Sequence, residues 1–330
     1  MRRHRSIPLA PLTTLLAALA VAGCGGSDGG GGGGSSQQQP EGAQQSRQIQ
    51  PVQGAQQAGT ITIGSKNFDE QFILGEIYAQ ALTAGGYDIE TELDIGSEVE
   101  AFAALKEGEI DGYPEYTGTA LTNLLDVDFK AIPRDPQGAF QLTREEYAKE
   151  GITALPPTPF ENSYRIGLLS QTAQELGNPT AISQLSDKAQ ELSITGYPEC
   201  RQRSDCRIGV EEAYGLKFGE FVTSQTPYEV LDEDQADLAF VFTTDGQLVT
   251  GQYKVLEDDK QFFPPYNVTL GMSDEAAQKL GPEGAALVQA VQEPLTNEVM
   301  QELNSRVAVD REEPEQVATD YLNSFGFVTK

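Results

Sequence analysis

Between residues 60 and 161, short stretches in which apolar and polar residues alternate are separated by stretches with apolar residues at helical spacing. Alternation is typical of strands, and a recurrence every three to four residues is typical of amphipathic helices. This pattern predicts strands at Thr60–Gly64, Tyr87–Ile95 and Ile110–Tyr113, and helices at Glu70–Gly85 and Val99–Gly108. Strands that alternate with helices indicate an α/β layer around a mostly parallel sheet.

The same alternation begins again at Tyr164. Strands are expected at Tyr164–Ser170, Leu192–Tyr197, Leu238–Thr243 and Phe262–Gly271, and helices at Ile182–Gln190, from Val210 onward, at about Ser273–Asn304 and at Pro314–Phe325. Two α/β units with a late return segment predict two lobes, with residues 60–161 and 265–330 in lobe I and residues 162–264 in lobe II. Two hinge crossovers, near Phe160–Ser163 and Phe263–Tyr266, would join the lobes around a ligand cleft.

The N-terminus has the pattern of an export signal. Basic residues precede the apolar stretch Leu9–Ala22, which is too short to span a bilayer stably and ends in Val-Ala-Gly-Cys at Cys24. It resembles a bacterial lipoprotein signal, which implies cleavage of residues 1–23 and a lipid on Cys24. An ordinary signal peptide with an incidental cysteine is the alternative. Residues 24–58 are mostly Gly, Ser and Gln and predict a flexible tether. We therefore expect an extracytoplasmic, lipid-anchored protein.

Composition removes several classes of function. The chain carries 22 Lys and Arg against 50 Asp and Glu, a formal charge of −28, which argues against nucleic acid as a partner. The single histidine, His4, lies in the segment expected to be cleaved, so no histidine catalysis, histidine metal site or cofactor is expected. Cys200 and Cys206, six residues apart in an exported chain, predict a disulfide rather than a metal site.

Candidate chemistry gathers at the ends of the predicted strands. Lys66 lies between a strand and a helix N-terminus, a place that suits an anion, although a solvated surface lysine is the simpler interpretation. Aromatic residues follow other strands in the segments Tyr113–Thr119 (YPEYTGT) and Phe262–Tyr266 (FFPPY), and at Tyr164 and Phe242. Each could be an ordinary core residue. Together they would form a cage that binds a quaternary ammonium group through cation–π contacts.

Several strings resemble one family, in that family's order. They are GSKNFDEQFILGE, ALKEGEIDGYPEYTGTAL, EAYGLKF, TTDGQL and VLEDDKQFFPPYNV. The chain resembles the substrate-binding lipoproteins of the Opu and ProX type, which serve ABC importers of glycine betaine, proline betaine, carnitine and choline. The resemblance covers about residues 60–330. It implies a two-lobed type II periplasmic-binding fold with mixed sheets, acting as a monomer that delivers a quaternary ammonium compound to a permease with an ATPase subunit.

The resemblance also implies the site residues. The cage would be formed by Tyr116, Tyr164, Phe242 and Tyr266. A ligand carboxylate would be held by Lys66, Thr119 and Arg203, and Asn162 would offer its backbone carbonyl to the positive end.

This sequence departs from the family pattern at three places. Phe242 stands where the family usually has tyrosine, so a phenol is missing. Cys200 replaces an aromatic residue, and the adjacent Arg201 competes with Arg203 for the carboxylate role. The segment Ser97–Glu100 (SEVE) replaces a small Gly/Thr-rich stretch and brings two acids toward the cleft, which could favour a full cation such as choline over a zwitterion.

Two other classes of function remain open from the sequence. A surface enzyme acting on a choline-type compound could use the acids Asp111 and Glu115, but no nucleophile with a base is present, so we expect no catalysis. A sensory or adhesion lipoprotein with the same fold is the other alternative.

Overall fold

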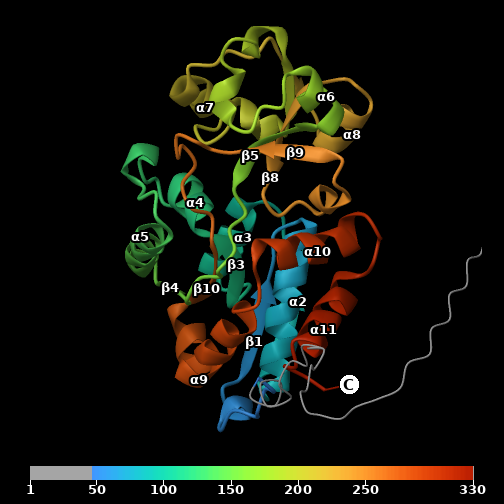
Figure 1. Ribbon diagram of the computed structural model, residues 1–330. Coiled ribbons are helices and arrows are strands. Elements are labelled where there is room, and N and C mark those ends of the chain that lie inside the picture. Colours follow the sequence, from blue (N-terminus) through green and yellow to red (C-terminus); the bar gives the residue numbers. More distant parts are fainter. Residues whose placement is uncertain (1–46, 330) are drawn as a thin grey trace, which may run out of the picture. The chain divides into compact units, whose positions relative to one another are not determined.

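The computed structural model describes residues 47–329, whose fold rests on two five-stranded sheets (Figure 1). The first sheet has the order β2-β1-β3-β10-β4. Its strands are β1 (Thr60–Gly64), β2 (Asp88–Glu92), β3 (Gly112–Tyr116), β4 (Ile152–Ala154) and β10 (Val268–Ser273). Strand β1 pairs in parallel with β2 and β3, whereas β10 runs antiparallel to β3 and β4.

The second sheet repeats this plan, with the order β7-β6-β8-β5-β9. Its strands are β5 (Tyr164–Leu169), β6 (Ser193–Gly196), β7 (Glu220–Thr223), β8 (Leu238–Phe242) and β9 (Tyr253–Leu256). Strand β6 pairs in parallel with β7 and β8, and β5 runs antiparallel to β8 and β9. In each sheet, one antiparallel strand is therefore inserted between a parallel trio and an edge strand.

The chain passes between the sheets twice, in residues 155–163 and 257–267. The two crossovers contact each other, since Glu161 forms an isolated antiparallel bridge with Asn267 and the Asn162 amide donates to the carbonyl of Tyr266 at 3.1 Å. Both expected hinge positions lie in these crossovers. The lobe boundaries expected from the sequence fall inside them and stay a prediction.

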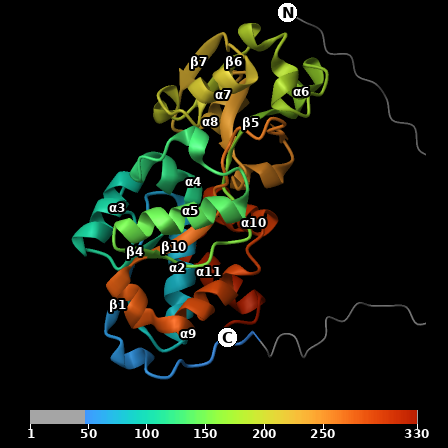
Figure 2. The ribbon, with the colours of Figure 1, turned by 90° about the vertical axis from the view of Figure 1, so that its left-hand side faces the viewer.

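Helices cover both sheets, as Figure 2 shows from the side. The α-helices are α2 (Asp69–Ala84), α3 (Glu98–Glu107), α4 (Thr117–Thr119), α5 (Pro136–Lys149), α6 (Ser170–Glu175), α7 (Arg207–Tyr214), α8 (Pro227–Asp232), α9 (Asp274–Gln292), α10 (Asn297–Ala308) and α11 (Pro314–Ser324). Shorter helical turns are η1 (Ala55–Gln57), η2 (Ala120–Leu124), η3 (Phe129–Ala131), η4 (Ile182–Leu185), η5 (Ala189–Glu191), η6 (Pro198–Arg201) and η7 (Gly246–Thr250).

Helix α2 shows how local sequence builds this layer. Its buried positions include Ile73, Ile77 and Ala81, which recur every four residues along one side of the helix. Acidic residues occupy its first turn, where they interact favourably with the helix dipole. Helix α3 begins at a capping box, in which the Ser97 amide donates to the Glu100 side chain at 2.7 Å.

Helix α10 makes a third, non-covalent connection between the two halves of the fold. The Asn304 Nδ2 atom donates to the carbonyl of Thr244 at 2.7 Å, and Gln301 Nε2 donates to the carbonyl of Thr243 at 2.8 Å. The backbone approach is close, because a Cβ atom at Gly246 would lie 2.4 Å from the Ser305 nitrogen.

Some of the expected elements differ from the structure. The strand expected from Phe262 begins only at Val268, because Pro264 and Pro265 have no N–H to donate to a ladder. The helix expected over about Ser273–Asn304 is divided into α9 and α10, with a further kink in α9 at Gly281, where φ is 67°.

The helix expected over Ile182–Gln190 forms only the two turns η4 and η5. The sequence pattern also gave no indication of α5, which starts at a cap where Asp135 accepts from the Gly138 amide at 2.8 Å. Among residues 47–329, no helix is long and apolar enough to cross a membrane.

Candidate functional site

The YPEYTGT segment forms β3 and α4, so its first half lies in a strand rather than after one, as the sequence analysis expected. Tyr116 ends β3 and is 4% exposed. Its phenol donates to Glu70 Oε1 at 2.7 Å, and its ring stacks on Phe68 with centroids 6.2 Å apart. The Lys66 Nζ atom lies 4.4 Å from the centre of the Tyr116 ring. A cation is therefore already placed on this ring.

Lys66 is buried and pairs with a buried carboxylate. Its Nζ atom forms an ion pair with Glu115, whose side chain has no exposed surface. Glu115 also accepts from the Tyr113 phenol at 3.1 Å and from the Tyr116 amide at 2.7 Å. Burial raises the pKa of Glu115, and the Lys66 charge only partly offsets that effect. The ammonium group of Lys66 is thus engaged inside the protein, and its role toward a ligand carboxylate stays a prediction.

A second group of rings lies on the other sheet. Tyr164 and Phe242 are paired residues on β5 and β8, and their ring centroids are 4.4 Å apart. Tyr197 lies 5.9 Å from the Phe242 ring, and Phe263 lies 6.4 Å from the Tyr164 ring. Strand pairing therefore explains why two residues 78 positions apart in the chain form one aromatic surface.

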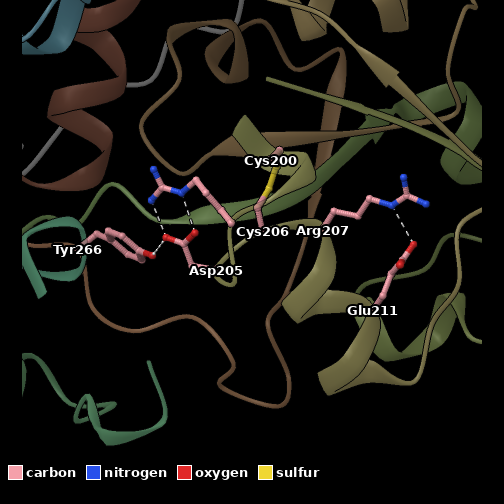
Figure 3. Close-up of a disulfide and its surroundings, with 7 residues drawn as sticks. Cys200, Asp205, Cys206, Arg207, Glu211 and Tyr266 are labelled. Atoms are coloured by element: carbon pink, nitrogen blue, oxygen red, sulfur yellow. Dashed lines mark hydrogen bonds and ion pairs between the residues drawn. A yellow bond between two sulfur atoms is a disulfide. The ribbon is translucent and has the colours of Figure 1, made fainter. Parts of the chain in front are cut away.

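Arg203 and Tyr266 meet at the carboxylate of Asp205. Arg203 Nε donates to Oδ1 at 2.7 Å, Arg203 Nη2 donates to Oδ2 at 2.6 Å, and the Tyr266 phenol donates to Oδ2 at 2.7 Å. Figure 3 shows Asp205 and Tyr266 directed toward each other beside the Cys200–Cys206 disulfide, which confirms the expected pairing of the cysteines. The Arg203 guanidinium also lies 5.6 Å from the Tyr164 ring centre.

The two arginines that compete for the expected carboxylate role have different partners in the structure. Arg201 donates to the Thr223 hydroxyl at 2.7 Å and to the Phe221 carbonyl at 3.2 Å, and so it lies along β7. Arg203 faces the Tyr164 ring instead. Burial alone would lower the pKa of Arg203, but hydrogen bonds with Asp205 raise it further above its ordinary range.

Glu98 links this arginine to the first sheet. Its Oε1 atom lies 3.5 Å from Arg203 Nη1 and accepts from Asn123 Nδ2 at 2.9 Å. Burial opposes ionisation, but hydrogen bonds from its own amide and from Asn123, together with the charges of Lys66 and Arg203, lower the pKa of Glu98. One of the two acids noted in the SEVE segment therefore contacts the candidate carboxylate-binding arginine.

Two buried residues that the sequence analysis did not single out belong to the same region. Glu70 is 3% exposed and accepts from Tyr116, from Asn162 Nδ2 at 3.0 Å and from Asn304 Nδ2 at 2.8 Å. Gln71 has no exposed surface, and its Nε2 atom has no hydrogen-bond partner within the described residues. Both follow directly in the GSKNFDEQ string, and this adjacency to Lys66 is the signal that could have identified them.

Thr119 and Asn162 are positioned by neighbouring segments. Thr119 is 9% exposed at the end of α4, one residue after Gly118, where a Cβ atom would lie 2.6 Å from the Tyr266 ring. Asn162 lies in the first crossover, and its side-chain Oδ1 atom is buried without a hydrogen-bond partner.

A hollow of about 620 Å³ opens beside Arg203. Its wall includes Asn123 from η2, Pro198 and Glu199 from η6, and Gln202, Arg203 and Ser204 from the loop that the disulfide closes. The four expected cage rings do not line this hollow. Tyr164 and Phe242 contact each other, whereas within residues 47–329 no ring contact joins Tyr116 or Tyr266 to them.

Cys24, the expected lipidation site, lies outside the described residues. Within those residues, no group of three or more His, Cys, Asp or Glu side chains is arranged to hold a metal ion.

Comparison with known proteins identifies the fold. The model of the substrate-binding domain of ABC-type glycine betaine transport systems matches residues 59–324. The glycine-betaine-binding protein of Pseudomonas aeruginosa is 34% identical over 285 residues, which cover 82% of this chain and 89% of that protein. The ergothioneine transport permease/ergothioneine binding protein EgtU of Helicobacter pylori is 29% identical over 270 residues, which cover 81% of this chain and 48% of that protein.

Among solved structures, one described as a glycine betaine/carnitine/choline ABC transporter superposes with a TM-score of 0.71 at 25% identity. The match covers 81% of this chain and 99% of that one. The expected α/β fold of type II periplasmic binding proteins is confirmed.

Proposed function

The chain belongs to the family of substrate-binding domains of ABC-type glycine betaine transport systems, and we propose that it captures a quaternary ammonium compound between the ring of Tyr116 on the first sheet and the rings of Tyr164 and Phe242 on the second. Proteins of this family bind a transported compound outside the cytoplasm and deliver it to a permease. They are transport proteins rather than enzymes, and we propose that this chain likewise performs no covalent chemistry.

The contact between Tyr164 and Phe242, with Arg203 over the Tyr164 ring, carries the proposal. Ring faces carry partial negative charge, and a methylated ammonium group has no N–H that would require an acceptor. Tyr266 joins this group through Asp205, and Tyr116 faces it from the first sheet in the proposed ligand-bound state. A ligand carboxylate would be held by Arg203, with Lys66, Thr119 and the unpartnered amide of Gln71 as further donors.

The charges around the rings favour a full cation over a zwitterion. Two cations, Lys66 and Arg203, are hydrogen-bonded here to Glu115, Asp205 and Glu98, and Glu70 adds a fourth carboxylate. Glu98 already occupies one side of the Arg203 guanidinium, so the carboxylate of a betaine must compete with it. We therefore propose that choline binds more tightly than glycine betaine.

Isothermal titration calorimetry of the purified chain with glycine betaine, proline betaine, carnitine, choline and ergothioneine tests this function. Tyr164→Ala should weaken binding of every ligand in the panel by about 1–3 kcal/mol, because it removes cation–π and packing contacts. Arg203→Gln should weaken glycine betaine more than choline, and Arg201→Gln is the matched control that should change neither. Absence of binding by all five compounds would reject the proposal.

The anchoring of the protein is a separate proposal. We propose that the thiol of Cys24 carries the lipid that holds the protein at the outer face of the membrane. Cys24→Ala should then release the protein from the membrane fraction of cells, and metabolic labelling with a radioactive fatty acid should be lost in the same variant. Labelling that survives the substitution would contradict this assignment.

A further inference from the structure

We propose that Asp205 is a positioning residue for ligand capture, held in place by the Cys200–Cys206 disulfide. The proposal rests on the proposed function, since it assigns to Asp205 the task of orienting two groups of that site. Asp205 is 1% exposed, and its neighbour Cys206 has no exposed surface. In Figure 3 its carboxylate lies between the disulfide and the Tyr266 phenol.

The carboxylate of Asp205 is shared by two side chains with different origins. Arg203 comes from the disulfide loop and binds it through both Nε and Nη2, which fixes the plane of the guanidinium. Tyr266 comes from the second crossover and donates its phenol to Oδ2. One buried carboxylate therefore sets the orientation of a candidate carboxylate-binding arginine and of a candidate cage ring at once.

The Tyr266 phenol remains a donor at physiological pH. Burial raises its pKa well above the ordinary range, and the Asp205 charge adds to that effect. If Asp205 lost its charge, the phenol would keep a weaker acceptor and the guanidinium would lose its bidentate partner. Arg203 would then retain only its 3.5 Å contact with Glu98 as an ion pair, and would turn toward that residue.

The disulfide limits where Asp205 can move. It closes a loop between residues six apart, with Cα atoms separated by 5.2 Å, and α7 begins immediately after it. The loop packs directly on α7, because a Cβ atom at Gly209 would lie 1.8 Å from the Ser204 carbonyl oxygen. The loop is therefore fixed at both ends, and Asp205 directly precedes Cys206, one of the two fixed residues.

A double-mutant cycle in ligand affinity tests the positioning role. Asp205→Asn should weaken choline about tenfold, Tyr266→Phe should weaken it to a similar degree while keeping the ring, and the double variant should be no worse than the poorer single variant. Arg207→Gln is the matched control, because Arg207 pairs with Glu211 on α7 and does not contact Asp205. Losses that multiply independently, or an equal loss in Arg207→Gln, would overturn the proposal.

A measurement without ligand separates this inference from the proposed function. The Arg203 Nε–H signal in a ¹⁵N–¹H NMR spectrum, assigned by its loss in Arg203→Gln, should be sharp and protected from exchange in the wild type. It should broaden or shift in Asp205→Asn and in the Cys200→Ser/Cys206→Ser double variant. An unchanged signal in the cysteine variant would show that the disulfide does not hold Asp205 in place. This conclusion would stand whether or not the wild type binds any compound of the panel.

Discussion

The buried ion pair between Lys66 and Glu115 offers a test of how this site is held together. The side chains are 4% and 0% exposed, so neither charge is solvated by bulk water in the intact pair. Breaking a buried pair by removing one member typically costs about 3–5 kcal/mol, because it leaves an uncompensated charge. We therefore expect Lys66→Met to lower the free energy of unfolding by about 3–5 kcal/mol.

Replacing the other member of the pair, in Glu115→Gln, should lower the free energy of unfolding by less than Lys66→Met does. Glu115→Gln leaves the Lys66 ammonium unpaired, but that group still lies 4.4 Å from the Tyr116 ring centre and 5.8 Å from that of Phe68. Cation–π contacts of this kind contribute about 0.5–2 kcal/mol. The double variant Lys66→Met/Glu115→Gln buries no charge at this place, so it should be more stable than Lys66→Met alone by about 2 kcal/mol.

Urea and thermal unfolding followed by far-UV circular dichroism would measure this cycle. For a domain of this size a change of 1 kcal/mol moves the melting temperature by about 2–4 °C, so Lys66→Met should melt roughly 6–20 °C below the wild type. Two additive single variants, or a loss below about 1 kcal/mol in Lys66→Met, would refute the reasoning. The Lys66 ammonium would then be a solvated group that is free to bind a ligand.

Two further predictions concern neighbouring residues. Burial raises the pKa of Asp245 from 3.8 to about 7, so between about pH 4 and pH 7 the unfolded chain releases a proton that the folded chain keeps, and stability falls as pH rises through this range. One oxygen of Asp245 accepts from both Tyr228 and the Phe242 amide, so Asp245→Asn keeps these bonds. Because Asp245 is partly exposed, the substitution should remove about 1–2 kcal/mol of the loss of stability between pH 4 and pH 8, measured by urea unfolding at both values. An unchanged pH dependence of stability in the variant would contradict the assignment. Gly118→Ala should lower stability by about 1–3 kcal/mol and weaken choline binding, because its Cβ atom would lie 2.6 Å from the Tyr266 ring; thermal unfolding and calorimetry identical to the wild type would show that the ring moves aside freely.

Periodicity predicted most of the elements that carry the site. Helix α2 and strand β1 lie within a residue or two of the expected ranges, because most of α2 and alternate positions of β1 are buried and the distribution of apolar residues records that burial. Contacts between residues that are distant in the chain cannot be predicted from such local patterns. Glu70 and Asn304 are hydrogen-bonded across 234 positions of the chain, and neither the helix pattern of α2 nor that of α10 indicates this contact.

The candidate site shows the same division. The strings YPEYTGT and FFPPY drew attention to clustered aromatic residues, and the family resemblance gave Tyr116 and Tyr266 a role in the cage, which stays a prediction. The preference for Arg203 over Arg201 came from the sequence and stays a prediction. The structure adds that the fold of the disulfide loop directs Arg203 to Asp205, whereas Arg201 donates to Thr223. The sequence could not show that Lys66 forms a buried ion pair with Glu115, since either residue alone resembles an exposed charged side chain.

The contact between α10 and the loop after β8 limits how the two sheets can move against each other. Suppose that the two sheets rotate against each other by bending only at residues 155–163 and 257–267. The hydrogen bonds Asn304–Thr244 and Gln301–Thr243 then stay intact only if the rotation axis passes close to α10. Any other axis would pull the helix away from the two carbonyls. If the proposed function holds, the amplitude of opening is thereby tied to α10, which contributes no ring to the expected cage, and a substitution on this helix should change the rate of ligand release without contacting the ligand.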